Sequence, residues 1–136
     1  MSVTTMNTNG VFQSPHYDHI ARVGDLAFLA GQVGRDPEGR LVGPNDAAAQ
    51  AVQAFANIGA HLAGIGARPA DVVKVTTLLV DRADRDAVGA AHRKFFDGHR
   101  PPHTLVIVAG LALAEMKVEV EVIVHAPAVG AGHQPA

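Results

Sequence analysis

The residues best suited to acid–base chemistry are Glu119, in an alternating segment near the C-terminus, and His103, directly after two prolines. A carboxylate can orient a water molecule or carry a proton in a hydrolytic reaction. An imidazole can act as acid or base, or hold an anion weakly, because its reference pKa of about 6.5 is close to neutrality. The alternative for Glu119 and Glu121 is that they form only the polar face of an amphipathic strand. The residue types alone leave both interpretations open.

Strand and helix patterns must position these side chains. Strands are predicted at 18–23 and 26–33, which are joined by a hairpin turn at Gly24 and Asp25, and at 71–80, 104–109 and 117–124. Helices are predicted at 45–65 and 84–98, because apolar residues recur there every three or four positions. The inward stripe of the first helix comprises Val52, Phe55, Ile58, Leu62 and Ile65.

The order of these elements predicts an α+β fold with two layers, a mixed β-sheet carrying both helices on one face. In 117–124 four valines alternate with Lys117, Glu119, Glu121 and Ile123, so the valines face one side and Glu119 faces the other. The second face of the sheet is left uncovered, and the chain is short with only 4% aromatic residues. Both features favour self-association. We expect a flexible N-terminus over 1–12, one domain over 13–125 and a disordered tail over 126–136.

The composition argues against several classes of function. The formal net charge is −2 and the 11 Lys and Arg residues are scattered, so no basic stripe for nucleic acid is visible. The chain has no cysteine, and its eight histidines do not follow a known metal-ligand spacing. No signal peptide or membrane-spanning run is recognisable. We therefore expect a cytoplasmic protein without a metal site.

Five segments in chain order resemble the reactive-intermediate deaminases, the Rid or YjgF-type family. The most specific is PPHTLVIVAGL at 101–111 followed by KVEVE at 117–121. The others are SPHYDH at 14–19, VGDLAFLAGQ at 23–32, DVVKVT at 71–76 and the paired phenylalanines at 95–96. Together they span most of the chain, from about residue 15 to 124.

The resemblance implies a chorismate-mutase-like fold and a homotrimer with three ligand pockets at the subunit interfaces. In the family's deaminases these pockets hydrolyse small enamines or imines to 2-keto acids and ammonia, without a cofactor or a metal. An arginine pairs with the substrate carboxylate, and a glutamate positions the attacking water. Glu119 falls on that glutamate if one residue is inserted between Leu111 and Lys117, and Tyr17 falls on the family's tyrosine.

The sequence departs from the family pattern at several pocket positions. His103 stands where the deaminases have the arginine, and a histidine is shorter and only partly charged near neutral pH. Arg100 could supply a replacement cation, although two prolines separate it from His103. Gly89 replaces an asparagine and Ala30 a serine, which removes hydrogen-bonding groups. Gly31 either lets the backbone approach a ligand or is only a bulge in a strand.

The resulting hypothesis is a trimeric Rid-type enzyme that hydrolyses an enamine, an imine or an amino-substituted unsaturated acid other than the substrates of its arginine-bearing relatives. Activity toward the relatives' substrates should be weak. Glu119 and His103 are the predicted catalytic residues; the predicted substrate-binding residues are Tyr17, Gly31, Arg100, Ala30 and Gly89. The alternative is a trimer that only binds or senses a metabolite. A third hypothesis, an endoribonuclease, is disfavoured by the acidic balance of charge.

Overall fold

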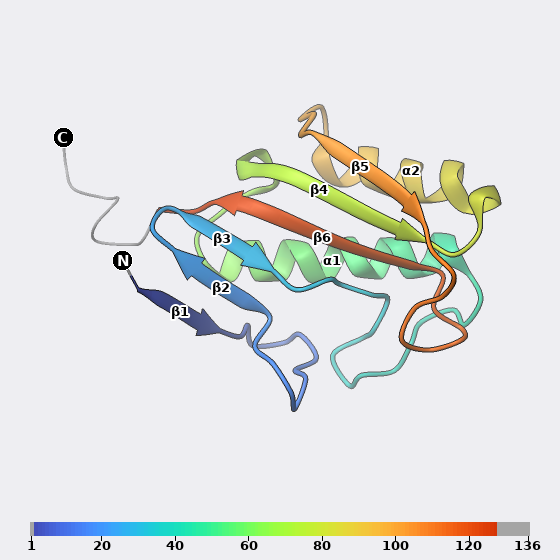
Figure 1. Cartoon of the computed structure of the whole chain (residues 1–136), viewed down its shortest axis with the longest axis horizontal. Helices are drawn as coiled ribbons and strands as arrows, with labels where there is room; N and C mark the ends of the chain where they lie inside the picture. The colour runs from blue at the N-terminus through green and yellow to red at the C-terminus, as the bar shows by residue number, and fades with distance from the viewer. Residues whose placement is uncertain (1, 128–136) are drawn as a thin grey trace.

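The computed structural model describes residues 2–127, which form one six-stranded sheet with two helices against one of its faces (Figure 1). The sheet order is β1-β2-β3-β6-β4-β5, and every neighbouring pair is antiparallel except β4 and β5. This arrangement confirms the predicted α+β fold. The strands are β1 (Val3–Met6), β2 (Ile20–Val23), β3 (Leu26–Leu29), β4 (Val72–Leu79), β5 (His103–Ile107) and β6 (Val118–His125), and the helices are α1 (Ala47–Gly64) and α2 (Arg85–Phe96).

Asp46 caps the N-terminus of helix α1, and its side chain accepts a hydrogen bond of 3.1 Å from the amide of Ala49. Such caps satisfy one of the free amides of the first turn. The predicted inward stripe is correct for Phe55, Ile58, Leu62 and Ile65, which are buried, but wrong for Val52, which is 63% exposed. The helix instead turns small residues toward the sheet, including Ala47, Ala51 and Ala54.

The core lies between the sheet and the helices, and the alternation of β6 determines which side chains enter it. All four alternating valines of β6 are buried, whereas Glu119 and Glu121 lie on the other face. The alternation predicted for this strand is therefore confirmed. In β4, Val75, Thr77 and Leu79 are buried in the same layer.

The N-terminal segment was predicted to be flexible, and for residues 3–6 this prediction was wrong. They form β1, which pairs antiparallel with β2 in the register Val3↔Val23 and Met6↔Ile20. Polar side chains connect the segment to the rest of the fold, because Thr5 and Asn7 both donate to the carboxylate of Asp18, at 2.7 and 2.9 Å. At the other end, Ala126 is buried and donates its amide to the carbonyl of Asp25. The rest of the predicted tail, 128–136, lies outside the described residues.

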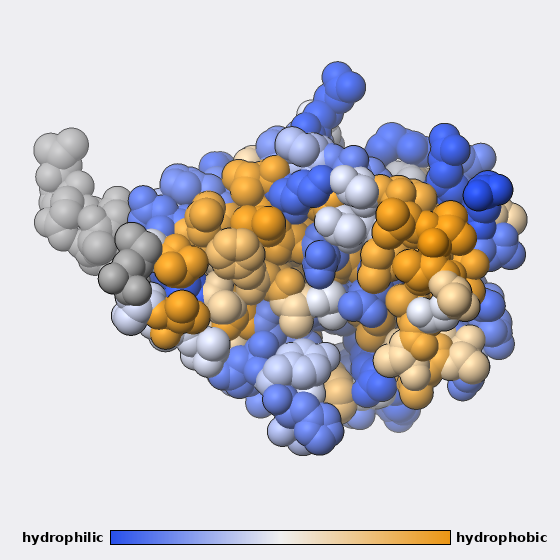
Figure 2. All heavy atoms as spheres, in the orientation of Figure 1, coloured by the Kyte–Doolittle hydropathy of each residue, from blue (hydrophilic) through white to orange (hydrophobic). Residues whose placement is uncertain are grey.

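The face of the sheet turned away from the helices carries large apolar side chains that remain exposed. Figure 2, in the orientation of Figure 1, shows hydrophobic side chains gathered over this face. Four of them are 38–43% exposed: Leu26, Phe28, Val73 and Val106.

Among the described residues, no helix combines the length and the apolar character needed to cross a membrane.

Candidate functional site

Glu119 lies over Gly31 at a bulge between β6 and the chain that continues from β3. Phe28 pairs with Ile123 and Gln32 pairs with Val120. Between these two pairs the chain after β3 contains one residue more than β6 does. A β-bulge of this kind redirects side chains beside it. A Cβ at position 31 would lie 2.7 Å from Cδ and 2.9 Å from Cγ of Glu119, and would overlap a carboxylate oxygen. Gly31 is thus required for the position of the Glu119 carboxylate.

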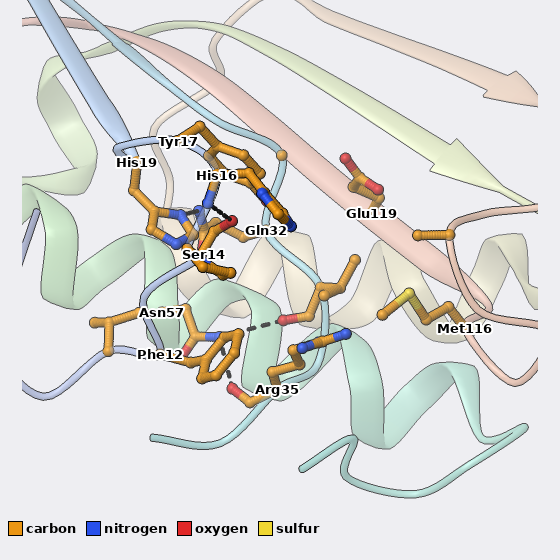
Figure 3. A pocket seen from close by; sticks show the side chains of 15 residues that line it. Phe12, Ser14, His16, Tyr17, His19, Gln32, Arg35, Asn57, Met116 and Glu119 are labelled. Atoms are coloured by element: carbon orange, nitrogen blue, oxygen red, sulfur yellow. Dashed lines mark hydrogen bonds between the residues drawn. The ribbon is translucent and has the colours of Figure 1, made fainter. Parts of the chain in front are cut away.

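The Glu119 carboxylate lines a cavity of about 320 Å³, a volume suited to a small molecule. Tyr17 and Gly31 line the same cavity, and Figure 3 shows Glu119 on one side of it and Tyr17 with His16 on the other. Burial, and to a smaller extent the charge of Glu121, raises the pKa of the Glu119 carboxyl. A carboxyl group with a raised pKa can both accept and return a proton near neutral pH.

A buried polar chain supports the floor of this cavity. Gln32 donates from Nε2 to the carbonyl of Ala30 at 3.0 Å and to Nδ1 of His19 at 2.9 Å. The Ala30 carbonyl can only accept, so the atom of the Gln32 amide that faces it is the NH2 nitrogen. The same nitrogen faces Nδ1 of His19, which therefore accepts a hydrogen bond. The proton of the neutral His19 ring lies on Nε2. The His19 ring stacks on that of His61 with centroids 5.0 Å apart, and Nδ1 of His61 is 2.8 Å from the hydroxyl of Thr8. No local pattern in the sequence indicates this stacked pair.

A second, more open hollow of about 470 Å³ lies between α2 and β5. His103 lines it, with Nε2 2.9 Å from the hydroxyl of Thr77 and with its ring 4.6 Å from that of His92. Burial lowers the pKa of both histidines, that of His92 to about 4, with repulsion from His103 and Arg93 adding to the effect. The nearby Lys74 further lowers the pKa of His103. His103 is therefore mainly neutral at pH 7.

The structure does not bring the two predicted catalytic residues together within one chain. His103 pairs with Val75, whose side chain is buried against the helices, whereas Glu119 points to the opposite face of the sheet. Tyr17 and Gly31 lie with Glu119, and Gly89 lies with His103. Arg100 is exposed and lines neither cavity, and Ala30 contributes its backbone carbonyl to Gln32.

Two residues of the second hollow, His92 and Arg93, were missed from the sequence as candidates for the site. Arg93 follows Gly89 by four residues and so lies on the same side of α2. That spacing was the signal that could have identified it. Within residues 2–127, no three His, Asp or Glu side chains are gathered closely enough to hold a metal ion.

Comparisons with known proteins point to one family. The model of the family described as endoribonuclease L-PSP matches residues 11–126. A 2-iminobutanoate/2-iminopropanoate deaminase from rat (Rattus norvegicus) is 32% identical over 117 residues, which are 85% of this chain and 85% of the rat protein.

Solved structures give the same result. RidA from the Antarctic bacterium Psychrobacter sp. is 30% identical and superposes with a TM-score of 0.83 over 90% of this chain and 98% of that one. The YjgF gene product of E. coli is 29% identical, with a TM-score of 0.82 over the same shares of the two chains. The chain therefore belongs to the endoribonuclease L-PSP family, the family of the Rid and YjgF proteins.

Proposed function

We propose that this protein hydrolyses small imines or enamines derived from amino acids to 2-keto acids and ammonia. The observation that carries the proposal is the Glu119 carboxylate, which is half-buried beside Gly31 in a small cavity and has a raised pKa. The similarity to proteins named 2-iminobutanoate/2-iminopropanoate deaminase supports the same reaction class.

The chemistry requires one group that moves protons. A water molecule attacks the imine carbon while Glu119 accepts a proton from that water. The proton returns to the nitrogen to give the carbinolamine. Glu119 then takes the hydroxyl proton and passes it to the amine, and the C–N bond breaks as the ketone forms and ammonia leaves. Water and imine together supply every atom of the keto acid and ammonia, so no redox partner is needed. Glu119 serves as base and then as acid, a role for which a carboxyl with a raised pKa is suited.

The site of this reaction is composite and forms between copies of the chain in a homotrimer. Each chain carries one cavity with Glu119 and Tyr17 and a separate hollow with His103 and Gly89, on opposite faces of its sheet. A ring of three chains joins unlike surfaces, so the hollow of one chain can face the cavity of the next. The exposed apolar face of the sheet is the surface that the ring would bury (Figure 2).

The test is a coupled assay in which an amino-acid oxidase generates imino acids in the presence of the protein. We expect the purified protein to release keto acid faster than spontaneous hydrolysis does. Replacing Glu119 by Gln keeps the side-chain volume but removes the proton carrier, and should lower the rate roughly 100-fold or more. Glu38→Gln is the matched control, because Glu38 is exposed in a turn and lines neither cavity. Equal rates for wild type and Glu119→Gln would refute the proposed role, and ligand binding without turnover would indicate a binding protein.

A further inference from the structure

The hollow beside α2 carries a positive charge that the predicted site did not include. On α2, Arg85, Gly89 and Arg93 are spaced four residues apart and lie on one side of the helix, and all three line the hollow. Glycine in the middle of a helix costs about 1 kcal/mol relative to alanine, so Gly89 does not serve helix formation. It instead leaves a gap between two arginines.

The Arg93 guanidinium lies at this gap. A Cβ placed on Gly89 would be 3.3 Å from Nη1 of Arg93, which is closer than most side-chain contacts allow. Arg93 forms no ion pair with any residue in 2–127, although Asp86 also lines the hollow. Its fork of N–H donors is therefore free to bind a ligand.

The histidines of the hollow cannot supply a permanent charge. His92 and His103 are mainly neutral at pH 7, and the Nε2 atom of His103 is engaged by Thr77. An arginine keeps its charge at all physiological pH values and can grip both oxygens of a carboxylate at once. Of the hollow's lining residues, only Arg85 and Arg93 combine these properties, and only Arg93 reaches the space above Gly89.

We propose that Arg93 binds the carboxylate of a small 2-imino or 2-keto acid in the space that Gly89 leaves open. The inference rests on the proposed function, because it assigns the carboxylate-binding residue of the same composite site. This assignment explains why position 103 can be a histidine. The positively charged side chain comes from α2 instead of β5, and the absence of a side chain at Gly89 leaves room for the guanidinium.

The test measures binding of a keto acid directly, so that it does not depend on turnover. The dissociation constant of 2-oxobutanoate is measured by calorimetry for wild type, Arg93→Gln and Lys94→Gln. Arg93→Gln should weaken binding roughly 10- to 100-fold, the effect of one lost charge-assisted hydrogen-bonding pair. Lys94 is exposed on the same helix and does not line the hollow, so Lys94→Gln should leave affinity unchanged.

Two further measurements keep the inference falsifiable. Gly89→Leu fills the gap with a good helix former, and should weaken binding at least as much as Arg93→Gln without lowering the melting temperature. In the Glu119→Gln protein, whose cavity side chain cannot titrate, affinity should stay nearly flat between about pH 6 and pH 8, whereas binding by a protonated His103 would weaken as pH rises. Unchanged affinity in Arg93→Gln, or affinity that follows histidine protonation, would overturn the inference. Keto-acid binding that needs Arg93, in a protein with no imine hydrolysis, would support the inference while refuting the proposed reaction.

Discussion

The buried histidine pair beneath the cavity should make the stability of the protein fall in mild acid. His61 has no exposed surface, and burial, with repulsion from His19, lowers its pKa from 6.5 to about 4. Its Nε2 atom is buried without a hydrogen-bond partner among residues 2–127, so a second proton there would have no acceptor in that part of the chain. The unfolded chain therefore binds this proton more readily than the folded protein does.

The sign and size of the effect follow from linkage. Because the pKa of His61 is lower in the folded protein than in the unfolded chain, neutral His61 contributes its full stabilisation above about pH 6.5. This contribution is lost as the pH falls toward about 4. Between about pH 7 and pH 5 the loss amounts to about 2 kcal/mol, since one pKa unit corresponds to about 1.4 kcal/mol. His92 adds to the acid loss in the wild type, so the contribution of His61 must be measured as a difference.

The assay is urea unfolding at several pH values and one fixed protein concentration, because the stability of an oligomer depends on concentration. The test variant is His61→Asn, whose amide can still meet the hydroxyl of Thr8 but does not titrate. His125→Asn, at the exposed end of β6, controls for loss of a surface histidine. His61→Asn should lose about 2 kcal/mol less than wild type between pH 7 and pH 5, whatever its stability at pH 7. Equal losses in both proteins would refute the argument.

Three further predictions concern the site, the assembly and the fold. Gly31→Ala should lower imine hydrolysis at least about tenfold with little loss of helix or sheet, because the new Cβ displaces the Glu119 carboxylate; a wild-type rate in the coupled assay would contradict this. Phe28→Asp should convert a trimer into monomers in analytical ultracentrifugation, because it places a charge on the exposed apolar face of the sheet, and an unchanged mass would remove this face from the interface. Asp46→Ala should destabilise the protein by about 1 kcal/mol in urea unfolding through loss of the α1 cap, whereas Glu38→Ala, at an exposed position in a turn, tests whether loss of any exposed carboxylate has this effect.

The sequence predicts the fold well where one periodicity is unbroken. The four valines of β6 alternate without interruption, and the stripe from Phe55 to Ile65 on α1 is regular, so both elements were placed within a few residues. β1 was missed because its Thr-rich composition has no apolar alternation, and its pairing with β2 depends on contacts across the chain such as that of Thr5 with Asp18. Val52 was placed inward because alanines carry little weight in a hydrophobic pattern, although small side chains suit close packing against a sheet.

The candidate site could be predicted residue by residue but not as an arrangement. The types and positions of Glu119 and Tyr17 indicated a site, yet nothing local in the sequence shows that His103 points to the opposite face of the sheet. That fact depends on the parallel register of β4 and β5. The approach of Arg93 to Gly89 is likewise a property of helix geometry, which a search for an arginine at one fixed position does not detect.

Mixed trimers test most directly whether each site combines residues of two chains. His103→Asp places a repelling carboxylate in the hollow, and Glu119→Gln removes the proton carrier from the cavity. The two variants are co-expressed with different affinity tags and purified over both, so that every trimer contains both kinds of chain. In a closed ring each mixed trimer has one junction at which the intact hollow of a Glu119→Gln chain faces the intact cavity of a His103→Asp chain. One of the three sites is then complete, so activity should recover to roughly a third of wild type. Activity no higher than that of the separate variants would contradict the composite site.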